Sequence, residues 1–268
     1  MMQQIISVTP TLCRLMQVPL PELSTPDIIR EVVNAAEGIL RGSLVEKCFI
    51  YAPDAIGQAL FQDYSAEFEP VLRLAPVQVV LRSVFPPKTP VCFASMFTGA
   101  QPEDHGIRQY EKPVLRCDTL FDVLLRMRKR VAIVAVEGSS ISLIFKERKI
   151  SYFIEEYDQQ VNSRVLQILH GSDDYDFILA YNQEYDDTMH KTTPRSSEAF
   201  KAMENHVKSF EQLSEAFLKH YKDHTRLVVF SPDHGVHINP ETGRGDHGLD
   251  ISDDMEVRSF WGIYGKCS

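Results

Sequence analysis

The chain has 268 residues, 44% of them apolar and 24% charged, which excludes a disordered protein and suffices for one globular domain over residues 1–268. Its net charge of −9 disfavours binding to a nucleic-acid polymer, because neutralising phosphates needs a basic face. No window approaches the ~20 apolar residues of a membrane span, and the first residues lack a signal-peptide pattern. Its five cysteines are scattered, without a C-x-x-C pair, as in reduced thiols. We therefore expect a cytoplasmic protein that does not contact a membrane.

Helix and strand patterns alternate along the chain, which predicts an α/β fold with crossover helices. The first clear helix has Thr25 as its cap, Pro26 in its first turn, an apolar stripe from Ile28 to Leu40 that includes Ile39, and Gly42 at its end. Strands are then expected at 45–52, 77–81, 131–136, 176–181 and 227–231, and helices at 118–128 and 197–221.

Acidic residues follow three of these predicted strands. Asp54 comes directly after 45–52, Asp186 lies five residues after 176–181, and Asp233 comes just after 227–231. Because the carboxyl ends of parallel strands line one crevice, the three acids are expected to converge there. Taken singly, an aspartate after a strand is usually a turn or helix-capping residue.

Histidines accompany these acids. His190 follows Asp186 by four residues, His234 is next to Asp233, and His247 lies in a glycine-flanked turn, Gly-Asp-His-Gly. Three aspartates and three histidines form a mixed nitrogen and oxygen ligand set for two divalent cations, which suits zinc, although manganese or iron also accept it. His190 and His247 could instead be a solvated side chain and a turn residue. We expect most of the other histidines to be surface or structural residues. His237 is the further metal-ligand candidate, because it lies only three residues after His234.

These residues resemble the alkaline phosphatase superfamily, and within it the nucleotide pyrophosphatase/phosphodiesterase branch. The resemblance covers residues from about 45 to 250. It rests on P-D-A-I-G from Pro53, T-P-V-C-F-A-S-M-F-T-G from Thr89 with P-E-D-H-G-I from Pro102, D-D-T-M-H-K-T-T-P from Asp186, D-H-G from Asp233 and the later G-D-H-G. It implies a doubly wound, mostly parallel sheet with helices on both faces.

The resemblance also implies a role for each site residue. Asp54, Thr89, Asp233 and His234 would hold one metal, and Asp186, His190 and His247 the other, with Thr89 as the nucleophile. The reaction would be hydrolysis of a small phosphate ester in two in-line steps through a phosphothreonine. The simpler reading of Thr89 is a helix cap ahead of Pro90.

The sequence departs from the family pattern in the substrate region. Tyr110 stands where the phosphodiesterases have an asparagine that donates to the phosphate, so Tyr110 or Lys112 is the candidate substitute. A sulfatase is disfavoured because Thr89 stands where sulfatases require a cysteine. A mutase is disfavoured because 268 residues leave no room for the cap domain of those relatives.

A further departure concerns the N-terminus. Residues 9–19 resemble the P-T-x-x-x-L-x-x-x-P segment that relatives carry after their last metal histidine. We therefore expect residues 5–20 to pack where that C-terminal segment would lie. The alternative is an ordinary N-terminal helix.

The leading hypothesis is thus a two-metal phosphoric ester hydrolase that acts on phosphodiesters or nucleotide-like pyrophosphates. The first alternative is a phosphomonoesterase or phosphonate hydrolase with the same core. The second is a non-catalytic metal-binding domain.

Overall fold

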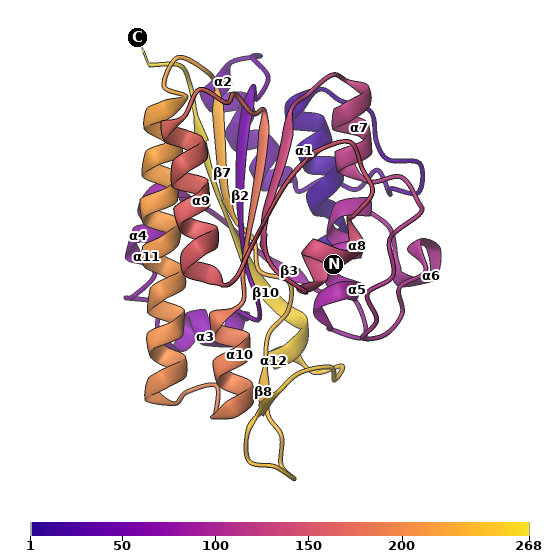
Figure 1. Ribbon diagram of the computed structural model, residues 1–268, viewed down its shortest axis with the longest axis vertical. Coiled ribbons are helices and arrows are strands. Elements are labelled where there is room, and N and C mark those ends of the chain that lie inside the picture. Colours follow the sequence, from indigo (N-terminus) through magenta and orange to yellow (C-terminus); the bar gives the residue numbers. More distant parts are fainter. Residues whose placement is uncertain (1, 268) are drawn as a thin grey trace.

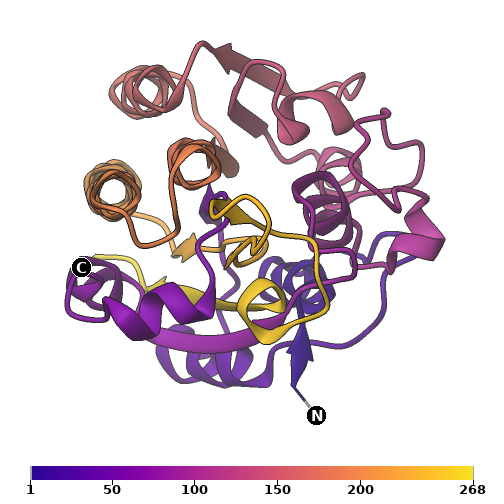
Figure 2. The same ribbon diagram turned by 90° about the horizontal axis from the view of Figure 1, so that it is seen from below.

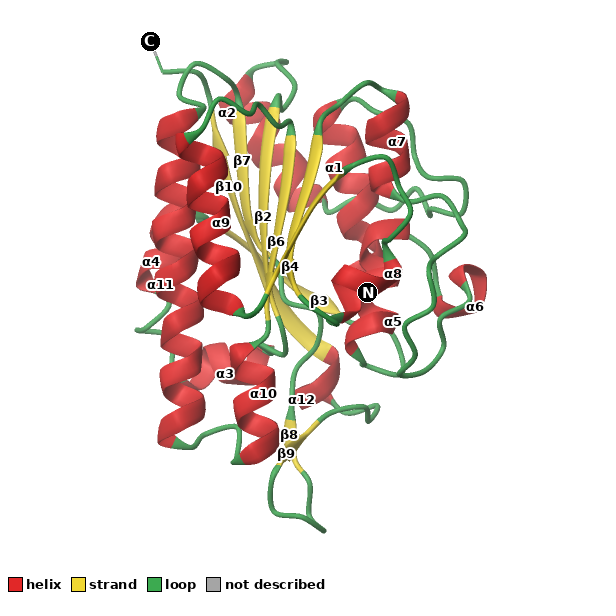
Figure 3. Ribbon diagram, viewed as in Figure 1, coloured by secondary structure: helices red, strands yellow, loops and turns green. Residues whose placement is uncertain are grey.

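A mixed, mostly parallel sheet of eight strands crosses the molecule, with helices on both faces (Figures 1 and 3). The computed structural model describes residues 2–267. It confirms the predicted α/β class and doubly wound sheet, because every pairing within this eight-stranded sheet is parallel except the two made by β10. In spatial order the strands are β1 (Gln3–Gln4), β3 (Val77–Arg82), β10 (Glu256–Tyr264), β7 (Arg226–Phe230), β2 (Lys47–Pro53), β6 (Phe177–Asn182), β4 (Val131–Val136) and β5 (Ser151–Glu155).

Four adjacent strands, β7, β2, β6 and β4, are buried along their whole length. Strands covered on both faces need apolar side chains at successive positions, which explains why their sequences are near-continuous apolar runs rather than alternating ones. The predicted strand at 131–136 coincides with β4, and the other predicted strands overlap β2, β3, β6 and β7 within two residues at either end.

Each face of the sheet has its own apolar core and its own helices. One core is built from α1 (Val8–Met16), α2 (Arg30–Leu40), α5 (Thr89–Thr98), α7 (Leu120–Arg126) and α8 (Ser140–Ile144). The other is built from α3 (Gln58–Asp63), α4 (Glu69–Leu74), α9 (Asp158–His170), α10 (Glu184–Lys191) and α11 (Ser197–His220). Helices α6 (Pro102–His105) and α12 (Ser252–Met255) and the hairpin β8 (His237–Ile238) with β9 (Gly245–Asp246) complete the described elements. None of the helices among residues 2–267 combines the length and the apolar character needed to cross a membrane.

The predicted start of the first long helix is wrong. The helix α2 begins at Arg30, and Thr25 does not cap it, because the preceding loop is held by tertiary hydrogen bonds. The Thr25 amide donates to the Gly99 carbonyl at 2.9 Å, and the Ile29 amide donates to Thr11 Oγ1 at 2.8 Å. The predicted stripe also fails at Ile39, which is 48% exposed, and the helix ends at Leu40, two residues before Gly42.

The N-terminal segment packs against α5. A 3-10 turn, η1 (Ile5–Ser7), leads into α1, and Thr9 Oγ1 donates to the Met96 carbonyl at 2.6 Å. Both elements are buried, so the segment is part of one core. Its equivalence to the C-terminal segment of the relatives stays a prediction.

Strand β10 was not predicted from the sequence, although it lies near the middle of the sheet. It runs antiparallel between β3 and β7. Gly262 lets it pass close to α4, since a Cβ at this position would lie 2.0 Å from the Leu74 carbonyl oxygen. This close contact depends on the position of α4, which is far from β10 in the sequence. No local sequence pattern therefore predicts it.

Candidate metal and catalytic site

The predicted acids meet at the carboxyl edge of the sheet, at the lower end of Figure 1 and facing the reader in Figure 2. Asp54 directly follows β2, Asp233 follows β7 by three residues, and Asp186 lies in α10, the helix that follows β6. Since β7, β2 and β6 are parallel neighbours, their carboxyl ends are adjacent.

The first cluster consists of Asp54, Asp233 and His234, all at most 2% exposed. Nε2 of His234 lies 3.4 Å from Asp54 Oδ1 and 3.4 Å from Asp233 Oδ2. Asp233 Oδ1 accepts from the Ala55 amide at 3.1 Å, and Tyr181 Oη donates to the second oxygen of Asp54. The remaining carboxylate oxygens are therefore directed at one point.

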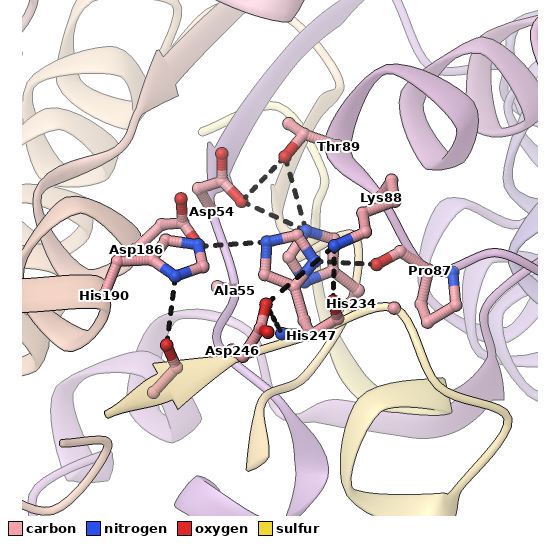
Figure 4. A network of polar contacts seen from close by, with 12 residues as sticks. Asp54, Ala55, Pro87, Lys88, Thr89, Asp186, His190, His234, Asp246 and His247 are labelled. Carbon is pink, nitrogen blue, oxygen red and sulfur yellow. Dashed lines mark hydrogen bonds and ion pairs between the residues drawn. The ribbon is translucent and has the colours of Figure 1, made fainter. Parts of the chain in front are cut away.

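The second cluster consists of Asp186, His190 and His247 (Figure 4). Asp186 Oδ1 lies 3.4 Å from Nε2 of His190 and 3.5 Å from Nε2 of His247. The two clusters are adjacent, because the rings of His234 and His247 stack with their centroids 4.0 Å apart.

All three histidines point the same nitrogen inward. Nδ1 donates to a backbone carbonyl in each: His190 to Gly245 at 3.0 Å, His234 to Gly235 at 3.1 Å and His247 to Pro87 at 2.8 Å. This fixes the tautomer and leaves the Nε2 lone pair free, as in metal-ligating histidines. Burial lowers the pKa of His234 and His247 and so favours the neutral form that binds metal.

The buried carboxylates of the two clusters would be stabilised by a bound cation. Burial and the charges of Asp233 and Asp186 raise the pKa of Asp54 well above its usual range, and burial raises that of Asp233. Two buried oxygens, Asp186 Oδ1 and Asp233 Oδ2, have no hydrogen-bond partner among the described residues. Ligands at about 2.0–2.1 Å from a tetrahedral zinc ion are roughly 3.3 Å apart, close to the 3.4–3.5 Å found here. The residues therefore fit two divalent cations.

Thr89 is the first residue of α5 and lies beside the first cluster. Its hydroxyl is 3.3 Å from His234 Nε2 and 3.5 Å from Asp54 Oδ1. The cap of α5 is Lys88, and no side-chain capping hydrogen bond is present at this end. The Thr89 hydroxyl therefore faces the cluster rather than its own helix.

Thr89, Asp54 and Asp186 line one cavity of about 120 Å³, which Tyr110 and Lys112 also border. Tyr110 is 61% exposed, and Lys112 Nζ lies 5.3 Å from the centre of its ring while donating to the Gly138 carbonyl at 2.9 Å. A wider hollow of about 700 Å³ beside α7 contains none of the predicted site residues.

Sequence reasoning missed the residues that hold the His247 turn. Lys88 Nζ donates to the His247 carbonyl. In the sequence, the one feature that could have suggested a role for Lys88 at the site is its position directly before Thr89. The fully buried Asp254 accepts from the amides of Gly248 and Leu249, each at 2.8 Å. His237, the further metal candidate, lies outside both clusters and donates to the Asp254 carboxylate at 2.8 Å.

Gly235 follows His234 at a point where no side chain fits, because a Cβ there would lie 1.9 Å from the Asp253 carbonyl oxygen. We expect Gly235→Ala to lower the free energy of unfolding by about 2 to 3 kcal/mol, measured by urea denaturation. Gly38→Ala is the matched control. Gly38 lies inside α2 with open space around it, so this change should raise stability by roughly 0.5–1 kcal/mol. Equal stability of the Gly235 variant and the wild type would contradict the close contact.

Helix α10, which carries Asp186 and His190, is held at its start by two other helices. The amides of Gln183 and Glu184 donate to the two carboxylate oxygens of Asp158 on α9, each at 2.9 Å. The next amide, of Tyr185, donates to Nε2 of His206 on α11 at 3.1 Å. Three successive backbone N–H groups thus have side-chain acceptors from outside the helix.

The buried His206 should make stability depend on pH. Its Nδ1 lies 2.9 Å from Tyr51 Oη, and burial lowers its pKa to about 3 from the ordinary value of 6.5. Between these values the unfolded chain binds a proton that the folded chain does not, so the contribution of His206 is complete above pH 6.5 and is lost as pH falls. From pH 7 to pH 5 the wild type should lose about 2 kcal/mol relative to His206→Gln. Urea denaturation with a metal chelator measures this, and a constant difference would contradict it.

Part of the chain matches a known protein family. The family model described as type I phosphodiesterase / nucleotide pyrophosphatase matches residues 72–121, which include Thr89, Tyr110 and Lys112. This match confirms the resemblance of the chain to the type I phosphodiesterases and nucleotide pyrophosphatases of the alkaline phosphatase superfamily, over the matched residues. No curated protein sequence matches the chain.

Three solved structures share its fold. Human ectonucleotide pyrophosphatase/phosphodiesterase 5 is 12% identical, with a TM-score of 0.63, over 82% of this chain and 88% of its own. An inactive form of the murine protein, in complex with AMP, is 14% identical, with a TM-score of 0.57 over 73% and 59%. Phosphonoacetate hydrolase from Sinorhizobium meliloti 1021, with phosphonoformate, is 15% identical, with a TM-score of 0.55 over 76% and 61%. The chain thus spans about three fifths of the murine and bacterial chains.

Proposed function

We propose that this protein is a phosphoric ester hydrolase of the phosphodiesterase family that uses two divalent cations and Thr89 as its nucleophile. The observation that carries the proposal is the position of the Thr89 hydroxyl, 3.3 Å from His234 and 3.5 Å from Asp54, on a cavity that Asp186 also lines. Asp54, Asp233 and His234 would hold one cation, and Asp186, His190 and His247 the other. Their nitrogen and oxygen ligand sets suit zinc.

When bound, the cations supply positive charge for the phosphate oxygens and lower the pKa of the attacking hydroxyl and water. Thr89 gives up its proton and its oxygen forms a bond to phosphorus, while the bond from phosphorus to the ester oxygen breaks and the alcohol leaves with a proton. Water then cleaves the phosphothreonine and restores the hydroxyl. The start of α5 adds partial positive charge beside the phosphate.

The substrate is a small phosphodiester or nucleotide pyrophosphate. The murine relative in complex with AMP supports a nucleotide-sized molecule. Lys112 supplies a positive charge to the wall of this cavity, and the carboxylates of Glu137 and Asp187 also line it. This balance favours a singly charged diester over a doubly charged terminal phosphate. Tyr110 and Lys112 are proposed to contact the substrate.

Metal content and ester hydrolysis, measured on one preparation, test the proposal. We expect two equivalents of transition metal and release of nitrophenol from bis-nitrophenyl phosphate faster than from nitrophenyl phosphate. Faster cleavage of the monoester would assign the protein to the phosphomonoesterases instead. Bound metal without hydrolysis of either ester or of a dinucleotide would indicate a non-catalytic domain, and absence of metal would overturn the site.

A further inference from the structure

A second polar cavity, of about 510 Å³, lies between helices α9 and α11 at the start of α10. The proposed reaction uses none of its side chains. Its volume is in the range of small-molecule sites, about 300–1,000 Å³. Amide and hydroxyl groups from both long helices line it, among them Asn162 and Ser163 of α9 and Asn205 and Ser209 of α11.

One residue that lines this cavity has a buried side-chain oxygen without a hydrogen-bond partner among the described residues. Asn182, at the end of β6, is 1% exposed, and its amide nitrogen donates to Asn162 Oδ1 at 3.0 Å and to the Asp158 carbonyl at 3.4 Å. These two bonds fix the orientation of the side-chain amide. Its Oδ1 accepts no hydrogen bond from any residue in the described range 2–267. A buried acceptor of this kind favours a ligand that brings a hydroxyl or amine donor.

Charge further restricts the ligand. The carboxylates of Asp158 and Glu184 line the cavity and face only one ammonium group, that of the exposed Lys208. A phosphate or other anion would be repelled there, so this cavity differs from the proposed catalytic one. Tyr157 and Leu166 supply apolar surface beside the polar groups.

We propose that this cavity binds a small uncharged molecule with several hydroxyl groups, such as a nucleoside or a free polyol. Asp158 and His206, which accept the amide N–H groups of Gln183, Glu184 and Tyr185 at the start of α10, also line the cavity. A bound ligand therefore restrains the helix that carries Asp186 and His190. This link to the catalytic site rests on the proposed function, whereas binding itself does not.

Calorimetric titration of chelator-treated protein with adenosine, with myo-inositol and with AMP tests binding alone. We expect saturable 1:1 binding of adenosine or inositol with a Kd of about 1 mM or tighter, and at least tenfold weaker binding of AMP. The adenosine and inositol arms distinguish a nucleoside from a free polyol. No saturable binding of either uncharged probe at millimolar concentration would overturn the proposal, as would tighter binding of AMP.

Variants at the rim locate the site. Ser163→Trp on α9 and Gln212→Trp on α11 place a large ring at exposed lining positions and should each weaken binding at least tenfold. Gln160→Trp, exposed on α9 outside the lining, is the matched control and should bind normally. Binding that survives both rim variants would place the ligand elsewhere. In zinc-loaded protein the ligand should also change the affinity of the α10 metal site about fivefold or more, and no change would limit the inference to binding.

Discussion

Replacing Thr89 with alanine is expected to lower kcat for diester hydrolysis by roughly 10³-fold or more while both metal clusters stay loaded. The hydroxyl is the nucleophile of the proposed reaction, and it lies within hydrogen-bond distance of both His234 and Asp54. Because the hydroxyl makes no capping bond to α5, its loss should leave the helix and the free energy of unfolding nearly unchanged. Steady-state hydrolysis and elemental analysis on the same sample measure both effects.

Thr89→Ser is the matched control for this experiment. It keeps a hydroxyl at the first position of α5 and should retain measurable turnover. Rapid acid quenching of the wild type during turnover should yield Thr89 with the added mass of one phosphoryl group, detected in a peptide by mass spectrometry. Full activity of the alanine variant would exclude Thr89 as the nucleophile and leave direct attack by water as the mechanism.

Replacing Asp233 with asparagine should affect the metal-loaded and metal-free proteins in opposite directions. With metal, the variant should bind one equivalent fewer and lose most of its activity, because a carboxylate of the first cluster is gone. Without metal, it should be more stable than the wild type by roughly 1–3 kcal/mol. Asp233 Oδ2 is buried without a partner in the described chain and adds to the negative charge around Asp54, whereas an amide would be neutral and would donate a hydrogen bond.

Asp187→Asn is the matched control, since Asp187 lines the same cavity as Thr89 but belongs to neither cluster. It should keep both metal equivalents and show little change in stability with a chelator present. Elemental analysis and urea denaturation with and without chelator measure these effects. A chelator-treated Asp233 variant less stable than the wild type would show that this carboxylate is stabilising without a cation, contrary to the electrostatic argument.

The strand pattern of the sequence predicted that Asp54, Asp186 and Asp233 converge, because each acid follows a near-continuous apolar strand and parallel strands end at one edge. The resemblance to the phosphodiesterases, rather than the pattern, implied how the six metal-ligand candidates divide into the two groups that the structure brings together. The sequence also located the strands β7, β2, β6 and β4, whose burial on both faces leaves a strong local pattern. Those features depend on residues that are near one another in the chain.

Tertiary structure decided what depends on distant residues. The helix α2 starts at Arg30, later than predicted, because Gly99 and Thr11 hold the preceding loop through hydrogen bonds between residues far apart in the sequence. The position of β10 between β3 and β7, and the support of α10 by Asp158 and His206, likewise have no local signal. The physical reason is that a periodic apolar pattern records burial along one element, whereas a hydrogen bond between separate elements is specified only once the chain has brought both partners together.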